Sequence, residues 1–129
     1  MTNTTAGIKA AQKILIIEDE GEMCLVLNIL LSNEDIELEH VKKISSAVEY
    51  LKQNQPSLII LDNKLPDGYG VDFINFLKRN YPGIKIVMIT GYDNSVKDVA
   101  LENGADLFLE KPFTKQQLFE SIRSLLNEE

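Results

Sequence analysis

The sequence predicts an α/β fold: a five-stranded parallel sheet with helices on both faces, wound in (βα)5 order. Short apolar runs recur along the chain, and each is followed by turn residues and a segment with helical apolar spacing. The run Leu58–Leu61 is continuously apolar, which is typical of a strand buried on both faces. Strands that alternate with helices join one parallel sheet through right-handed crossovers.

The composition is that of one soluble globular domain. The chain has 129 residues, of which 44% are hydrophobic and 26% charged. Its net charge of -7 argues against direct contact with nucleic acid. A single cysteine, Cys24, fits a reducing compartment, and no apolar run approaches the roughly 18 residues of a membrane span. We therefore expect a cytoplasmic protein without a membrane partner, with a flexible tail over residues 1–12 and one domain over 13–129.

Five apolar segments have the length and pattern of strands. In the second segment, apolar residues alternate with glutamates, whereas the other four segments are almost continuously apolar. The predicted strands are Lys13–Ile17, Ile36–Val41, Leu58–Leu61, Ile84–Ile89 and Leu107–Leu109.

Segments with apolar residues at helical spacing follow each strand. Ser45 or Ser46 is a candidate N-cap for the second helix and Thr114 for the last, whereas Gly104 is a candidate terminator of the fourth. The predicted helices are Glu22–Leu31, Ala47–Asn54, Gly70–Asn80, Val96–Asn103 and a final one after Thr114.

Polar side chains follow four of the strands, and parallel strands bring their carboxyl ends to one edge of the sheet. These residues are Glu18 and Asp19, then Asp62, Thr90 and Lys111. Crowded carboxylates repel one another unless a cation lies among them, and oxygen ligands suit Mg²⁺. A carboxylate beside a bound cation can attack a phosphoryl group, whose oxygens Lys111 and Thr90 would contact. The expected product is an aspartyl phosphate on Asp62.

In order and in position, these residues resemble the receiver domain of two-component response regulators, a flavodoxin-like, CheY-like superfamily. The resemblance covers Lys13 to Asn127 and includes the acidic pair, Asp62, Thr90-Gly91, and two short motifs, Pro66-Asp67-Gly68 and Lys111-Pro112-Phe113. It implies that Asp62 accepts a phosphoryl group from a sensor histidine kinase or a histidine phosphotransfer protein. The domain would catalyse its own phosphorylation and dephosphorylation, and would not be an enzyme acting on other substrates.

The resemblance also implies a metal site and a switch. Asp19, Asp62 and the backbone carbonyl of Lys64 would bind Mg²⁺, or Mn²⁺ as a substitute, and Glu18 would act through water. Thr90 would move toward the phosphoryl group while Phe108 rotates inward, controlling a downstream protein target or an effector domain. It further implies a cis peptide bond before Pro112.

Two hypotheses concern neighbouring residues. Lys64 and Tyr92 lie two residues after Asp62 and Thr90, so both are expected at the mouth of the site, where they would slow attack by water. Leu25 and Ile29 have no obvious place in the core, so they are candidates for docking a partner helix, with packing against the last helix or the N-terminal tail as the alternative. We assign no role to His40, which we expect on the surface.

Three other classes of protein are alternatives to a receiver domain. An aspartate-nucleophile phosphatase would usually carry a second aspartate two residues after the nucleophile, where this chain has Lys64. A nucleotide-binding fold would have a glycine-rich loop after the first strand, which is absent from the sequence. A protein-interaction module that works without phosphorylation stays open as the alternative.

Overall fold

The computed structural model describes residues 12–21, 25, 28–29, 36–91 and 94–126. Residues 1–11 of the proposed tail, most of the helix predicted at Glu22–Leu31, and Tyr92 therefore lie outside the described residues, as does Cys24.

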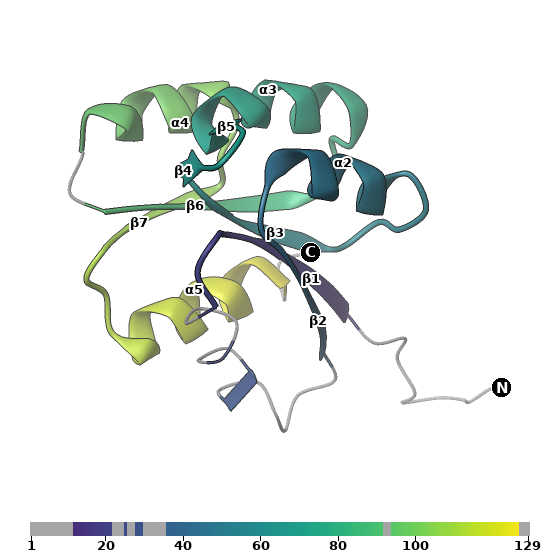
Figure 1. Ribbon diagram of the computed structural model, residues 1–129. Coiled ribbons are helices and arrows are strands. Elements are labelled where there is room, and N and C mark those ends of the chain that lie inside the picture. Colours follow the sequence, from purple (N-terminus) through teal and green to yellow (C-terminus); the bar gives the residue numbers. More distant parts are fainter. Residues whose placement is uncertain (1–11, 22–24, 26–27, 30–35, 92–93, 127–129) are drawn as a thin grey trace, which may run out of the picture.

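A five-stranded parallel sheet forms the centre of the domain, as predicted (Figure 1). The strand order is β2-β1-β3-β6-β7, so β3 lies in the middle with β1 and β6 on either side. Each boundary lies within one residue of the prediction, and β1 begins at Gln12, which we had placed in the tail. The strands are β1 (Gln12–Ile17), β2 (Ile36–Val41), β3 (Leu58–Asp62), β6 (Lys85–Thr90) and β7 (Leu107–Glu110).

The described helices cover both faces of this sheet (Figure 1). Helices α2 (Ile44–Leu51), α3 (Gly70–Asn80) and α4 (Lys97–Asn103) pack on one face, and α5 (Lys115–Leu126) packs on the other. A single 3-10 turn, η1 (Asn94–Val96), leads into α4. None of the described helices is both long and apolar enough to cross a membrane.

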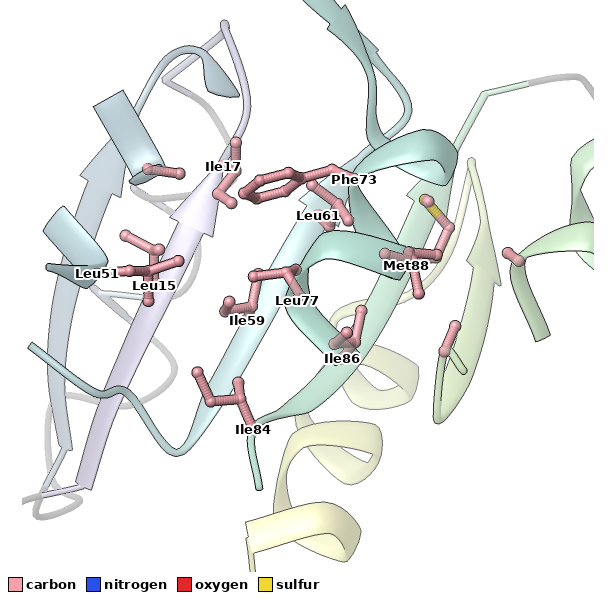
Figure 2. Packing of buried hydrophobic residues seen from close by; sticks show 14 residues of the cluster. Leu15, Ile17, Leu51, Ile59, Leu61, Phe73, Leu77, Ile84, Ile86 and Met88 are labelled. Carbon is pink, nitrogen blue, oxygen red and sulfur yellow. The ribbon is translucent and has the colours of Figure 1, made fainter. Parts of the chain in front are cut away.

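Two hydrophobic clusters fill the two sides of the sheet. Side chains of β3 alternate between them: Ile59 and Leu61 face α2 and α3, whereas Leu58 and Ile60 face α5. All four are at most 2% exposed, which explains why the run is continuously apolar. Figure 2 shows Phe73 and Leu77 of α3 lying over the strands in the first cluster.

The start of α2 differs from the prediction. The helix begins at Ile44, so neither Ser45 nor Ser46 is its N-cap, and it ends at Leu51 rather than Asn54. The Asp67 carboxylate caps it instead: Oδ1 accepts the Ile44 N–H at 2.8 Å, and Oδ2 accepts the Ser45 N–H at 2.9 Å. The cap comes from a distant part of the chain, so local sequence cannot indicate it.

Two other predicted helix ends are confirmed. Thr114 Oγ1 accepts the N–H of Gln117 at 3.0 Å, and Gln117 Oε1 accepts the N–H of Thr114 at 2.8 Å, forming a reciprocal cap at the start of α5. Gly104 ends α4 with φ of 118°, a left-handed conformation that favours glycine.

The segment after β3 forms a small antiparallel hairpin that we did not predict. Its strands, β4 (Lys64–Leu65) and β5 (Gly68–Tyr69), are joined by the two-residue turn Pro66-Asp67. The hairpin connects the end of the central strand to α3 and so borders the edge where the predicted site residues lie.

Candidate functional site

An open cleft of about 500 Å³ lies at the carboxyl ends of the central strands. It is lined by residues that end or follow four different strands, as the sequence predicts for this edge of a parallel sheet. The lining residues are Asp19, Glu20, Asp62, Asn63, Lys64, Thr90, Gly91 and Lys111. Five of the predicted site residues are thus brought together.

Asp62, the last residue of β3, is held firmly in this cleft. Its side chain is 15% exposed, and Oδ1 accepts the N–H of Asn63 at 2.8 Å. Its Oδ2 lies 3.7 Å from Lys111 Nζ, which forms an ion pair across the cleft. One carboxylate oxygen is therefore fixed by the backbone, and the other faces a cation.

The charges around Asp62 act in opposite directions on its pKa. Burial raises the pKa of Asp62 most; Lys111 and the Asn63 N–H lower it, and the nearby Asp19 and Glu20 raise it. The net effect is a raised pKa. The folded protein therefore keeps this carboxylate in surroundings that do not fully compensate its charge.

The backbone on both sides of Asp62 is tightly packed. Asn63 N–H also donates to Ile89 O at 3.1 Å, and Asn63 Oδ1 accepts the Val71 N–H at 3.1 Å at the start of α3. A Cβ atom added to Gly70 would lie only 2.2 Å from Asp62 O. Glycine at this position therefore lets the first turn of α3 pack directly on the main chain of Asp62.

The three acidic residues after β1 occupy different places. Asp19 and Glu20 are exposed and line the cleft, whereas Glu18 is only 4% exposed and does not line it. His40 Nε2 lies 2.9 Å from Glu18 O and 3.9 Å from Glu18 Oε1. His40, which we expected on the surface, is only partly exposed: its side chain is 19% exposed and contacts the acidic segment. Glu20 was missing from our predicted site, although it stands in the same acidic run.

Thr90 and Phe108 lie on the same face of the sheet. Thr90 is 5% exposed at the end of β6, and Phe108 on β7 pairs in register with Met88, two residues before Thr90. Phe108 packs against the cluster beneath α2, α3 and α4 and also borders a groove with Lys97 and Phe113. The predicted switch pair is therefore placed on adjacent strands, with Thr90 lining the cleft and Phe108 outside it.

The family model of the response regulator receiver domain matches residues 14–123. The chain belongs to this family. The cis peptide bond expected between Lys111 and Pro112 is present.

Individual relatives agree with this assignment. The phosphate regulon transcriptional regulatory protein PhoB of Escherichia coli is 34% identical over 119 residues, covering 90% of this chain and 52% of PhoB. A CheY-like receiver domain from Methanospirillum hungatei superposes with a TM-score of 0.84 at 28% identity, covering 92% of this chain and 95% of that one. The beryllofluoride-activated NtrC4 receiver domain dimer superposes with a TM-score of 0.83 at 32% identity, covering 90% and 97%. The receiver domain spans about half the length of the curated relative PhoB.

The donor atoms of this receiver domain fit Mg²⁺. Carboxylates of Asp19, Glu20 and Asp62 line one cleft together with Lys64, and hard oxygen ligands are those that Mg²⁺ prefers. Within the described ranges, no three histidine, cysteine, aspartate or glutamate side chains form a ready-made metal cluster. A site with few side-chain ligands suits Mg²⁺, because this ion keeps several of its waters.

The described residues bear on two further hypotheses, which concern the mouth of the cleft and the docking surface. Lys64 is exposed at the cleft, as expected for a residue at its mouth, and Tyr92 lies outside the described residues. Leu25 and Ile29 are 64% and 66% exposed, which agrees with their having no place in the core. Their role in partner docking stays a prediction.

Proposed function

We propose that this receiver domain accepts a phosphoryl group on Asp62 in a Mg²⁺-dependent reaction. A sensor histidine kinase or a histidine phosphotransfer protein would be the donor. The observation that carries the proposal is the position of the Asp62 carboxylate: it is mostly buried, opens into an acidic cleft and lies 3.7 Å from the Lys111 ammonium group.

The chemistry follows from these groups. A carboxylate oxygen of Asp62 attacks phosphorus and forms an O–P bond while the N–P bond to the donor histidine breaks, so the donor nitrogen takes the bonding electron pair. Lys111 supplies positive charge to the phosphoryl oxygens, and the Thr90 hydroxyl donates a hydrogen bond to them. Asp19, Asp62 and the Lys64 carbonyl would hold Mg²⁺, with Glu18 acting through water. Bound Mg²⁺ would reduce the repulsion between the carboxylate and the incoming phosphoryl group.

The same groups would return the domain to its starting state. Water attacks phosphorus, the O–P bond to Asp62 breaks, and inorganic phosphate leaves. Lys64, which is exposed at the cleft, would hinder this water, and Tyr92 would have the same role. If either side chain hinders the water, Lys64→Ala or Tyr92→Ala will lose the phosphoryl group faster than the wild type, and unchanged rates would remove that role.

We propose that the signal leaves through Thr90 and Phe108. Phosphorylation would draw Thr90 toward the cleft and let Phe108 rotate inward, which biases an equilibrium between two conformations. The target would be a downstream protein or an effector domain rather than nucleic acid bound by this domain itself, because the net charge of the chain is -7.

Intact-protein mass spectrometry after incubation with acetyl phosphate and Mg²⁺ tests the proposal. We expect one added phosphoryl group in the wild type, and none in Asp62→Ala or when Mg²⁺ is chelated. Asp72→Asn is the matched control, because Asp72 is an exposed carboxylate in the first turn of α3 and does not line the cleft. An unmodified wild type that also fails to bind beryllofluoride would favour the alternative, an interaction module that works without phosphorylation.

The surface on which the phosphoryl donor docks can be tested separately. Leu25→Glu should lose phosphotransfer from the partner protein but keep labelling by acetyl phosphate if the exposed face of the first predicted helix is the docking surface. Retained phosphotransfer would exclude Leu25 from that surface.

A further inference from the structure

The corner between β2 and α2, residues 40–45, contacts both sides of the proposed metal site. On one side, Glu18 N–H donates to Val41 O at 3.1 Å, and His40 Nε2 lies 2.9 Å from Glu18 O. On the other side, the N–H groups of Ile44 and Ser45 donate to the Asp67 carboxylate. The corner therefore joins the acidic segment after β1 to the hairpin after β3.

The hairpin itself is too short to fix its own position. Each strand has two residues, and an isolated two-stranded hairpin is at best marginally stable in water. Its root is held at Asn63, whose carbonyl accepts the Gly70 N–H at 2.7 Å. Its tip is held where Asp67 binds the corner. Lys64, whose carbonyl would be a metal ligand, lies between these two anchors.

Apolar packing brings the same two segments together. A Cβ atom added to Gly68 would lie 3.0 Å from Ile44 Cδ1, so the hairpin passes closely over the first residue of α2. Leu65, Val41 and Ile44 all pack against one hydrophobic cluster. Apolar packing places the tip of the hairpin, the turn Pro66-Asp67, against the corner. The hydrogen bonds of Asp67 then fix the position of the tip on the corner.

The chemistry of the Asp67 contact suits an anchor. A carboxylate at a helix N-terminus binds N–H groups that have no partner within the helix and interacts favourably with the helix dipole. Hydrogen bonds to a charged acceptor are stronger than those between neutral groups. The N–H groups of Ser45 and Ile44 lower the pKa of Asp67, because they bind the ionised form of the carboxylate.

We propose that Asp67 is a positioning residue for the metal site: by holding the hairpin tip on the β2–α2 corner, it fixes the Lys64 carbonyl relative to Asp19 and Asp62. This role rests on the proposed Mg²⁺ site. A ligand arranged before binding need not be ordered by the ion, so affinity is higher. Loss of groups that orient metal ligands typically weakens affinity about 10- to 100-fold.

The test is Mg²⁺ binding by isothermal titration calorimetry, with Asp67→Ala compared with the wild type. We expect the dissociation constant to rise about 10-fold. Asp67→Asn, which keeps one acceptor oxygen, should lie between the two. Asp72→Ala is the control, because it removes the same charge from a nearby exposed position that does not contact the corner.

A second readout separates positioning from loss of folded protein. The Mg²⁺ concentration that gives half the maximal rate of labelling by acetyl phosphate should rise about 10-fold in Asp67→Ala, and the rate at saturating Mg²⁺ should stay within about twofold. An irreversibly unfolded fraction would lower the maximal rate and leave the half-saturating concentration unchanged. A reversibly unfolded fraction would raise that concentration as well, but a 10-fold rise would require roughly nine-tenths of the variant to be unfolded. Circular dichroism before each titration confirms that the variant is folded.

The possible failures are distinguishable. If the wild type binds Mg²⁺ and Asp67→Ala binds it equally well, Asp67 has no positioning role and the proposed function is unaffected. If Asp72→Ala loses as much affinity as Asp67→Ala, the effect is one of net charge and the proposal is also overturned. If the wild type binds no Mg²⁺, the proposed function falls, and this role falls with it.

Discussion

Replacing Gly70 by alanine tests how closely α3 packs on the phosphoacceptor. The new methyl group would lie 2.2 Å from Asp62 O and 2.9 Å from Leu61 Cγ, whereas Cβ atoms essentially never lie closer than 3.0 Å to a non-bonded heavy atom. The first turn of α3 must therefore move by about 0.8 Å, and this weakens the 2.7 Å hydrogen bond from Gly70 N–H to Asn63 O.

The free-energy cost can be worked out from these contacts. Overpacking typically costs about 1–3 kcal/mol, and a weakened hydrogen bond costs about 0.5–1.5 kcal/mol. The better helix propensity of alanine offsets at most about 1 kcal/mol. We expect Gly70→Ala to lower the free energy of unfolding by about 2–3 kcal/mol, which corresponds to a fall of about 1–2 M in the urea midpoint. Labelling of Asp62 by acetyl phosphate should also slow, because the displaced main chain carries the acceptor.

Urea denaturation followed by circular dichroism measures this cost. Gly83→Ala is the matched control, because the nearest atom to its added methyl group, Gln55 Nε2, is 4.0 Å away. A Gly70→Ala variant within about 0.5 kcal/mol of both the wild type and Gly83→Ala would refute the argument that glycine is required for this contact.

Three further predictions concern stability. Asp62→Asn should be more stable than the wild type at pH 7, because the raised pKa of Asp62 means that ionisation disfavours the folded state. The difference in the free energy of unfolding should shrink as the pH falls toward the unfolded pKa of about 4. A difference that grows on acidification would contradict this prediction. Leu77→Ala, at a fully buried position, should cost about 2–5 kcal/mol by urea denaturation, whereas Leu101→Ala, at a position that is 40% exposed, should cost less than about 1 kcal/mol; equal losses would refute the burial argument. Thr114→Ala removes the cap that receives the Gln117 N–H and should cost about 0.5–2 kcal/mol in the same assay, whereas an unchanged midpoint would show that water replaces the cap.

The strands and the cleft were predictable because their signals are local. The apolar run ending at Asp62 indicates a buried strand whatever lies elsewhere, and parallel order alone brings Asp62, Thr90 and Lys111 to one edge. Thr114 caps a helix that begins at the next residue, so its role is also visible in the sequence.

The parts that could not be predicted depend on contacts between distant segments. Asp67 caps a helix that begins 23 residues earlier, at Ile44, so the neighbouring serines offered a false local candidate. His40 contacts Glu18 from 22 residues away, across the β1–β2 pair. The hairpin after β3 contains only two residues in each strand, too few for an apolar pattern to reveal it.

The central place of β3 in the sheet has a consequence for how the domain opens. Because β3 is paired on both sides, its amide hydrogens can exchange with solvent only if neighbouring strands separate as well, whereas the edge strands β2 and β7 can open locally at lower cost. Asp62 ends the strand with the highest expected protection, and Phe108 lies on an edge strand. The domain can thus rearrange at its edge strands while Asp62, at the end of the central strand, keeps its geometry.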